Sequence, residues 1–376
     1  MTEVSRLHAV ARATLMIRSS RWQALIAVMG VTVLCLTPRA KAGGTDRDSP
    51  AVDPRQSTAA CRTDCAVGRQ LLVTLSGVNT TKLGAMVVRD RQGRYAAVTG
   101  DFRQIMVFDA TGKPLDAPRP SFGRIVSLFV DSAGVVRTYD ITAGSLLTFD
   151  DNYKSTAQTE LPHRPALLLS GDRSLVASQI ATPALVGKPL HVMSKDGKIE
   201  RSFGGDGGVY RDSETLKNAR AVCLNPDGTV WSIASGGRLL ERWDTATGRR
   251  LAQVAVKSTW FHESHAPAEP NQVANPIILT IWAEKDLVWI LYRVPDPHWV
   301  PRSMNPADFA PTGEVANRRS DWILEAVRID TGSVVAMKTF DNILLRRDGS
   351  IAIASDTTPA NGAAGVELWA PILVKK

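Results

Sequence analysis

The sequence predicts an all-β protein, a six-bladed β-propeller of four-stranded blades. Short runs of β-branched and apolar residues are separated by turns with Asp and Gly, as in residues 125–150, IVSLFVDSAGVVRTYDITAGSLLTFD. This pattern is typical of antiparallel hairpins. Turn motifs recur at Asp109, Asp150, Ser194 and Asp244, at spacings of roughly 40–50 residues, the length of one four-stranded blade.

Six two-strand openings set the expected number of blades. They are MVVRDRQGRYAAVTG, LFVDSAGVVRTYD, LLLSGDRSLVAS, VCLNPDGTVWSIA, LTIWAEKDLVWILY and LLRRDGSIAIAS. The step from Asp244 to the next turn motif, at Asp330, is long enough for a seventh blade. Because that stretch contains only one opening, we expect six blades.

The two ends of the chain are expected to close the ring together. The last repeat supplies three strands, and residues 71–75, LLVTL, would add the fourth. An incomplete last blade would leave an open sheet edge, which propellers avoid. In the alternative, the C-terminal PILVKK supplies the fourth strand itself.

The N-terminus has the order of a secretory signal peptide. Arg18 and Arg21 precede the apolar run WQALIAVMGVTVLCL, and the small residues of Ala40-Lys41-Ala42 follow it. We therefore predict a signal peptide over residues 1–42, a flexible leader over 43–67 and the propeller over 68–376. The alternative is an uncleaved membrane anchor, for which the apolar run is short.

The charge of the chain argues against a nucleic-acid partner. The formal net charge is +8, but residues 1–42 hold six basic residues and one acid, so the remainder has 39 basic and 36 acidic residues, a net charge of +3. That charge suits solubility rather than phosphate binding. We expect a secreted or periplasmic monomer, free of the membrane after signal cleavage.

Three cysteines remain after the predicted cleavage. Cys61 and Cys65 lie in CRTDC and could close a small disulfide loop in an oxidising compartment. Cys223 lies in the apolar run AVCLNPDG, and we interpret it as a buried, inert strand residue rather than a nucleophile.

The strand–DG–strand pattern resembles that of six-bladed propellers of the NHL and TolB-like group over residues 68–376. The match is best in residues 203–231, where FGGDGG leads through LKNARAVCLNPDGTVW into the next inner strand. The other five repeats keep the pattern but not the residues. The resemblance implies the fold and leaves the function open, because propellers include both enzymes and binding modules.

Four long connections should emerge on one face of the ring. A four-stranded blade sends the loop between its second and third strands, and the loop to the next blade, to the same side. Residues 179–188, 203–219, 256–276 and 294–320 fall at such positions. Long loops on a rigid scaffold are where binding sites concentrate.

These loops contain the candidate ligand-binding residues. They are Trp260, His262, His265, His298 and Trp299. The tryptophans could stack on a ligand or could fasten the loops onto the ring. His262 and His265 could bind a divalent metal or could be solvated loop residues. Asp206 in GDGG could bind an anion or calcium, although a flexible turn explains the motif as well.

The sequence therefore supports two functions. The first is an exported binding or scaffold module for a peptide, protein or glycan, with no cofactor. The alternative is a metal-dependent hydrolase or lactonase. The sequence has no GxSxG, P-loop or dinucleotide fingerprint. The acid and asparagine pattern of calcium-dependent propeller lactonases cannot be placed residue by residue, so catalytic residues stay unknown.

Overall fold

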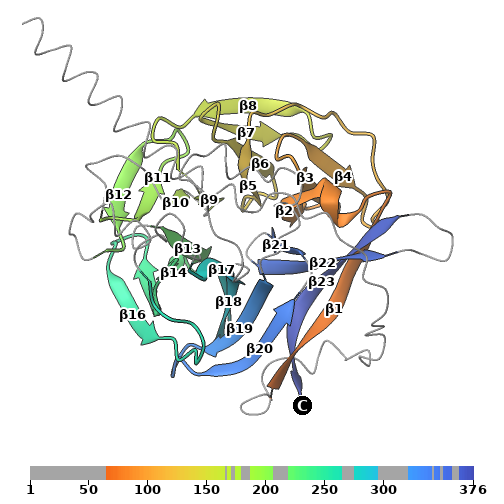
Figure 1. Ribbon diagram of the computed structural model, residues 1–376. Coiled ribbons are helices and arrows are strands. Elements are labelled where there is room, and N and C mark those ends of the chain that lie inside the picture. The colour runs from red at the N-terminus through yellow and green to blue at the C-terminus, as the bar shows by residue number, and fades with distance from the viewer. Residues whose placement is uncertain are drawn as a thin grey trace, which may run out of the picture.

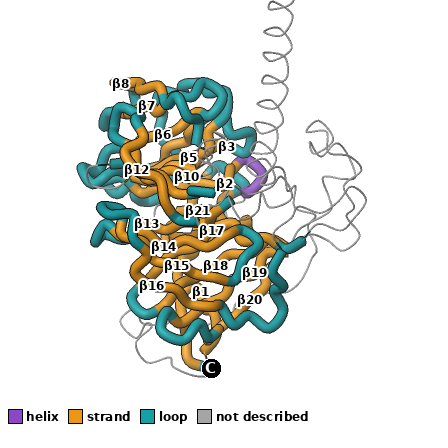
Figure 2. Tube along the Cα trace, turned by 90° about the vertical axis from the view of Figure 1, so that its left-hand side faces the viewer, coloured by secondary structure: helices purple, strands orange, loops and turns teal. Residues whose placement is uncertain are grey.

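The computed structural model shows six blades of β-strands arranged as a ring (Figure 1), which confirms the predicted propeller. It describes residues 65–165, 167–170, 174–178, 187–205, 219–264, 275–294, 321–340, 343–347, 350–357 and 364–376. Seen from the side, the strands dominate and the one described helix is a single short turn (Figure 2).

Blades 2 to 5 are antiparallel sheets whose four strands follow the chain order. Blade 2 comprises β5 (Ile125–Val130), β6 (Val136–Asp140), β7 (Ser145–Phe149) and β8 (Ser155–Glu160). Blade 3 comprises β9 (Leu167–Ser170), β10 (Leu175–Ser178), β11 (Leu190–Met193) and β12 (Ile199–Phe203). Blade 4 comprises β13 (Arg220–Leu224), β14 (Thr229–Ala234), β15 (Leu239–Asp244) and β16 (Arg250–Ala255). Blade 5 comprises β17 (Ile277–Glu284), β18 (Leu287–Val294), β19 (Asp321–Arg328) and β20 (Val334–Phe340).

Blades 1 and 6 meet where the ring closes. Blade 1 follows the 3-10 turn η2 (Thr80–Lys82) and comprises β2 (Leu83–Arg89), β3 (Tyr95–Thr99) and β4 (Ile105–Phe108). Blade 6 comprises β21 (Ile343–Arg347), β22 (Ser350–Thr357), β23 (Gly365–Lys375) and β1 (Cys65–Ser76). Parallel pairing of β2 with β21 joins them into one seven-stranded sheet.

The fourth position of blade 1 is reduced to one antiparallel bridge, between Phe108 and Pro114. The segment that follows β4 contains Pro114, Pro118 and Pro120. Proline has no N–H to donate to a neighbouring strand, so this segment cannot form a regular outer strand.

The predicted closure of the ring by the N-terminal strand is confirmed. β1 pairs antiparallel with β23 from Cys65 opposite Lys375 to Ser76 opposite Gly365 (orange beside blue in Figure 1). The strand is thus longer than the five residues predicted. The C-terminal PILVKK does not form a strand of its own, because it continues β23.

A β-bulge between Leu71 and Val73 divides β1 into two halves. Before the bulge, Cys65 and Val67 pack in the cluster formed mainly by blade 5. After it, Val73 and Leu75 pack with residues of blades 1 and 6. A bulge shifts the side to which a strand directs its side chains, which explains how one strand serves both neighbouring blades.

The repeated turn residues fold as local hydrogen-bonded caps. The carboxylate of Asp109 accepts hydrogen bonds from the backbone N–H groups of Thr111 and Lys113, at 2.8 and 3.0 Å. Asp150 repeats the arrangement in blade 2. In blade 3 the hydroxyl of Ser194 accepts from the N–H of Lys198 at 3.1 Å. The periodic positions predicted in these blades are therefore equivalent in structure.

In blade 5 the repeat position lies two residues before the predicted one. The N–H of Arg328 bonds the carbonyl of Ser333, and the N–H of Gly332 bonds the carbonyl of Arg328. Asp244 makes the same two bonds in blade 4: its N–H donates to the carbonyl of Arg249, and its carbonyl accepts from the N–H of Gly248. Arg328 rather than Asp330 therefore occupies the repeat position, and Asp330 instead forms an ion pair with Arg328 at 2.7 Å.

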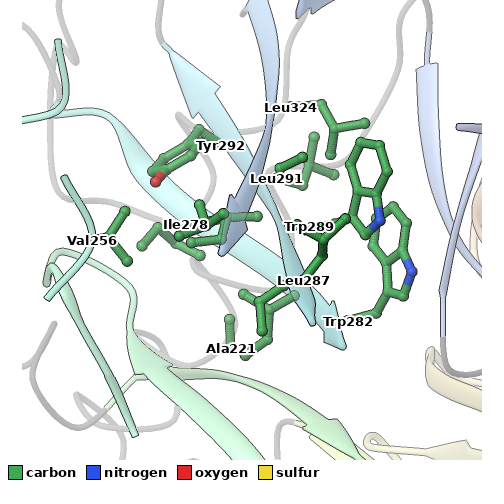
Figure 3. Packing of buried hydrophobic residues seen from close by; sticks show 14 of the residues in the cluster. Ala221, Val256, Ile278, Trp282, Leu287, Trp289, Leu291, Tyr292 and Leu324 are labelled. Carbon is green, nitrogen blue, oxygen red and sulfur yellow. The ribbon is translucent and has the colours of Figure 1, made fainter. Parts of the chain in front are cut away.

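The core is divided into clusters that lie between neighbouring blades, and the largest surrounds blade 5 (Figure 3). There the rings of Trp282 and Trp289 stack at 5.0 Å with an interplanar angle of 7°. Cys223 belongs to the same cluster and is 4% exposed, and burial raises the pKa of its thiol to about 11. The prediction that Cys223 is a buried strand residue is thus confirmed.

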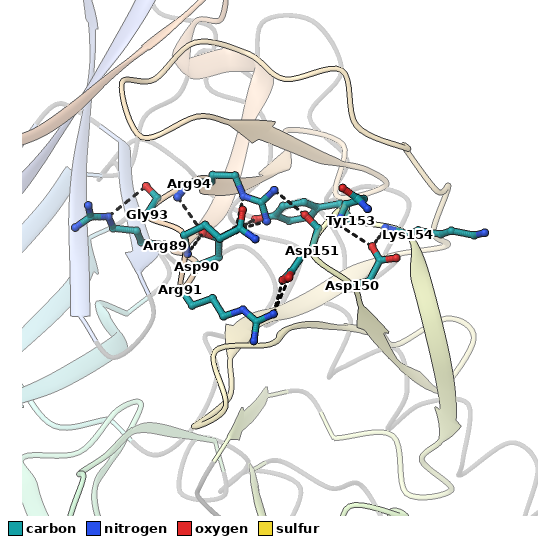
Figure 4. A network of polar contacts seen from close by, with 11 residues as sticks. Arg89, Asp90, Arg91, Gly93, Arg94, Asp150, Asp151, Tyr153 and Lys154 are labelled. Atoms are coloured by element: carbon teal, nitrogen blue, oxygen red, sulfur yellow. Dashed lines mark hydrogen bonds and ion pairs between the residues drawn. The ribbon is translucent and has the colours of Figure 1, made fainter.

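A polar network joins the first strand turn of blade 1 to the last turn of blade 2 (Figure 4). Asp90 is 7% exposed and accepts hydrogen bonds from Arg94 Nε at 2.7 Å and from the Tyr153 hydroxyl at 3.0 Å. Arg91 pairs with Asp151 at 2.7 Å, and Arg94 also donates to the carbonyl of Asp151. The buried carboxylate is fully satisfied, so it fixes the two blades together at this end.

We expect Leu75→Ala to destabilise the ring far more than Leu71→Ala on the same strand. Leu75 is fully buried between blades 6 and 1, whereas Leu71 is 46% exposed. Emptying the buried site should cost about 2–5 kcal/mol, and the exposed site about 0.5 kcal/mol or less. Chemical denaturation measures both values. Equal losses in the two variants would contradict closure through β1.

We also expect His191 to make the protein less stable in acid. His191 on β11 is fully buried, its Nδ1 lies 2.9 Å from the Ser202 hydroxyl, and burial, aided by the nearby charge of His163, lowers its pKa from 6.5 to about 4. Between these values the unfolded chain binds a proton that the folded chain does not. The stabilisation is therefore complete above about pH 6.5 and is lost as the pH falls to about 4, a change of about 3 kcal/mol.

Unfolding free energies measured from pH 7 to pH 4 test this expectation. The curve for His191→Gln should be flatter than that of the parent protein, and that for the exposed His262→Gln should be unchanged. Parallel curves for His191→Gln and the parent would show that His191 does not cause the acid sensitivity.

Candidate functional site

The two ends of the ring differ in how their connections are held. We call the end with the loops between second and third strands, and between blades, the loop face, and the opposite end the turn face. On the loop face, backbone bonds join connections that are distant in sequence. The N–H of Ser235 bonds the carbonyl of Ala219, that of Ile278 bonds Ser235, and that of Ser264 bonds Gly236. The described ends of the connections over 203–219 and 256–276 therefore meet above blades 4 and 5.

A buried carboxylate fastens the connection between blades 4 and 5 to the ring. Glu325 on β19 is 1% exposed. Its Oε1 accepts hydrogen bonds from the Ser258 hydroxyl at 2.7 Å and from Trp260 Nε1 at 2.8 Å, and its Oε2 accepts from the Tyr292 hydroxyl at 2.8 Å. Removing a carboxylate from water is costly unless it is hydrogen-bonded, and these three donors supply the bonds.

The aromatic rings around Glu325 exclude water from it. Tyr292 lies 5.0 Å from Trp260 and 4.9 Å from Phe261, measured between ring centroids. Burial, together with the negative charge of Glu325, raises the pKa of Tyr292 well above its ordinary value. Tyr292 is therefore a neutral donor at all physiological pH values.

An arginine from blade 4 holds the same connection from its other side. Arg238 donates from Nε to the carbonyl of Val256 at 3.2 Å and from Nη2 to the carbonyl of Ser258 at 2.7 Å. Arg238 thus holds this connection to blade 4, and Glu325 holds it to blade 5. Its first turn is a rigid part of the loop face.

The predicted site residues fall into two groups. Trp260 is half-buried, and its indole N–H donates to the buried Glu325. Of the two predicted roles for the tryptophans, Trp260 therefore has that of fastening its loop onto the ring. His262, two residues later, is exposed. His265, His298 and Trp299 lie outside the described residues, and their contact with a ligand stays a prediction.

The sequence analysis did not identify Glu325, Tyr292 or Ser258. One signal was present, because Glu325 is an acid in the middle of the apolar run WILEAV of β19. A charged residue at a core position needs a buried partner. Its partners could not be named from the sequence, since Ser258 and Trp260 are more than sixty residues away along the chain.

Within the described part of the chain, no group of three or more His, Cys, Asp or Glu side chains has the arrangement of a metal site. The metal hypothesis depends on His262 together with His265, and on Asp206. His265 and Asp206 are outside the described residues, so the hypothesis is untested.

Cys65 is disulfide-bonded, and its partner lies outside the described residues. Pairing with Cys61 stays a prediction. None of the described helices is long and apolar enough to span a membrane.

Comparisons with known proteins identify the fold. No family model and no curated protein sequence matches the chain. Among solved structures, the chain is similar to a member of the DUF4221 family from Bacteroides vulgatus, with a TM-score of 0.52 and 10% identity over 84% of this chain and 99% of that one. It is also similar to a candidate exported protein of Bacteroides fragilis, with a TM-score of 0.50 and 9% identity over 85% and 98% of the two chains. At such low identity these likenesses show the propeller fold alone.

We expect Glu325→Leu to release the connection that contains Trp260. The variant leaves the Ser258 hydroxyl, the Trp260 indole N–H and the Tyr292 hydroxyl without an acceptor, at a cost of about 1–3 kcal/mol for each donor. Backbone hydrogen exchange over residues 256–264 should become at least tenfold faster. Glu325→Gln, which keeps one acceptor oxygen, should lie between the parent and Glu325→Leu. Unchanged exchange in Glu325→Leu would show that Glu325 does not hold the loop.

Proposed function

We propose that the protein is an exported β-propeller that binds a peptide, protein or glycan on its loop face above blades 4 and 5. The observation that carries this proposal is the fastening of the loop start by Glu325, Trp260 and Tyr292. A loop held in one conformation loses little entropy when a ligand binds. The fastened turn leads directly to the exposed His262.

The turn face offers less to a ligand. Its connections are tight turns capped by their own side chains, such as those at Asp109 and Asp150. The four long connections, residues 179–188, 203–219, 256–276 and 294–320, are all predicted to lie on the loop face. Aromatic and polar side chains on such connections, here Trp260, His262, His265, His298 and Trp299, are the groups that binding pockets use.

Export is supported by the N-terminal pattern and by the disulfide at Cys65, because disulfides persist in oxidising compartments. One of the structural neighbours is a candidate exported protein. We assign the mature chain to residues 43–376, in the periplasm or outside the cell, as a monomer without a membrane anchor. We also propose a relationship to the NHL and TolB-like propellers, on the sequence pattern of residues 203–231.

Binding of the mature protein to peptide and glycan arrays, followed by titration of the best ligand, tests the proposed face. His262→Ala, and in a second set His265→Ala, His298→Ala and Trp299→Ala, should each weaken binding, by about tenfold for a lost contact of 1.4 kcal/mol. The matched control is Arg91→Ala on the turn face, whose ion pair with Asp151 is 52% exposed on both sides.

Loss of binding in the Arg91 variant, with full binding in all loop-face variants, would contradict the proposed face. A divalent metal retained at one equivalent by the purified mature protein would favour the hydrolase or lactonase alternative instead.

A further inference from the structure

Toward the loop face, the interface between blades 3 and 4 contains three buried polar atoms that no hydrogen bond satisfies in the described structure. They are Ser178 Oγ, Ser232 Oγ and Arg220 Nε. A fourth such atom in this interface, Nε1 of Trp243 on β15, lies nearer the turn face. Both serines are fully buried, and Arg220 is 8% exposed. Buried donors without acceptors are rare in folded proteins, so three of them at one interface indicate that something else completes their bonds.

Arg220 and Ser232 are neighbours on the blade 4 side of this interface. Nη1 of Arg220 on β13 donates to Oε2 of Glu241 on β15 at 2.6 Å. The side chain must cross β14, which lies between those strands. Ser232 is the β14 residue that pairs with Glu241. The guanidinium therefore passes over Ser232.

Ser178 faces them from blade 3. Val176 on β10 and Val222 on β13 pack in one cluster between the two blades, and β10 contacts β13. Ser178 lies two residues nearer the loop face than Val176, and Arg220 two residues nearer than Val222. Side chains two residues apart on a strand point to the same side, so Ser178 and Arg220 both point into this interface, from its two opposite blades.

The charge at this interface is positive. Glu241 is 5% exposed and accepts a second guanidinium bond, from Arg250 Nη1 at 2.9 Å. Two arginines thus share one carboxylate, which leaves an excess of one positive charge. The valines below offer no acceptor, so Arg220 Nε–H has no counter-charge of its own.

We propose that this interface binds one small oxyanion, a carboxylate or a phosphate-like group, between Arg220 Nε, Ser178 Oγ and Ser232 Oγ. An N–H of arginine and two hydroxyls are all hydrogen-bond donors, and charge-assisted bonds from arginine to oxyanions are strong and directional. The proposal does not depend on the ligand of the loop face above blades 4 and 5.

Thermal unfolding of the mature protein in a series of sodium salts at equal ionic strength tests the site. Phosphate, sulfate and acetate are the probes, and chloride is the reference. A ligand that binds only the folded state raises Tm with its concentration. We expect at least one oxyanion to raise Tm in a saturable way beyond chloride. Acetate alone would identify a carboxylate site, and phosphate or sulfate alone a site for tetrahedral oxyanions.

Ser178→Ala and Ser232→Ala locate the effect. Each should weaken binding of the active oxyanion at least tenfold in calorimetric titration. Without the anion, neither should lower Tm, because each removes an unsatisfied buried hydroxyl. Arg220→Lys keeps a positive charge opposite Glu241 but removes Nε, and should also weaken binding. The matched control is Ser235→Ala. Ser235 directly follows β14, is 6% exposed, and is not among the residues with unsatisfied polar atoms.

Three results would overturn the proposal. The first is that no oxyanion raises Tm more than chloride does. The second is that both serine variants bind the anion as tightly as Ser235→Ala does. The third is a crystal structure grown with the oxyanion that raised Tm, with selenate in place of sulfate or phosphate, that shows only water between Arg220 Nε and the two hydroxyls.

Discussion

The antiparallel pairing of β1 with β23 is the constraint on which the ring depends, because it joins the first described strand to the last. Without β1, blade 6 would present the open edge of β23, and both neighbouring clusters would lose part of their cover. Cys65 and Val67 pack toward blade 5, and Val73 and Leu75 toward blades 1 and 6. The bulge at Leu71 and Val73 allows one strand to serve both clusters. The strand that closes the ring therefore also completes the packing of the two interfaces beside it.

The connections at the two ends of the closed ring are stabilised by different kinds of hydrogen bond. On the turn face, Asp109, Asp150 and Ser194 each cap the backbone within four residues of themselves, so these turns are held locally and repeat from blade to blade. The bonds of Asp90 and Arg91 to the last turn of blade 2 are added to these local caps. On the loop face, stability depends on long-range contacts such as those of Glu325 with Ser258 and Trp260. A turn that is capped by its own side chain must keep its length and its capping residue. A connection that is held only near its start can vary in length and sequence after that point. This difference is the physical reason to expect the ligand on the loop face.

Features that depend on local hydrogen bonds could be predicted from the sequence, and features that depend on long-range contacts could not. The number of blades, the repeat positions through Ser194 and the closing strand follow from local turn chemistry and from the need to cover a sheet edge. The shift from Asp330 to Arg328 was missed because RIDTG looks like the other turns, and only the backbone bonds separate them. The reduced edge of blade 1 had a visible signal in its three prolines. The roles of Glu325 and Arg220 could not be predicted, because their partners come together only in the folded ring.

Native-state hydrogen exchange on β1 and β23 tests the closed ring most directly. If β1 holds both neighbouring interfaces, its amides bonded to β23 should open only with the whole ring. Their opening free energy should then equal that of the slowest amides in the inner strands β5 and β13, and should fall with denaturant at the same slope. Exchange of β1 through a separate, smaller opening that leaves β5 and β13 protected would contradict this dependence, because it would show that the ring persists when β1 detaches.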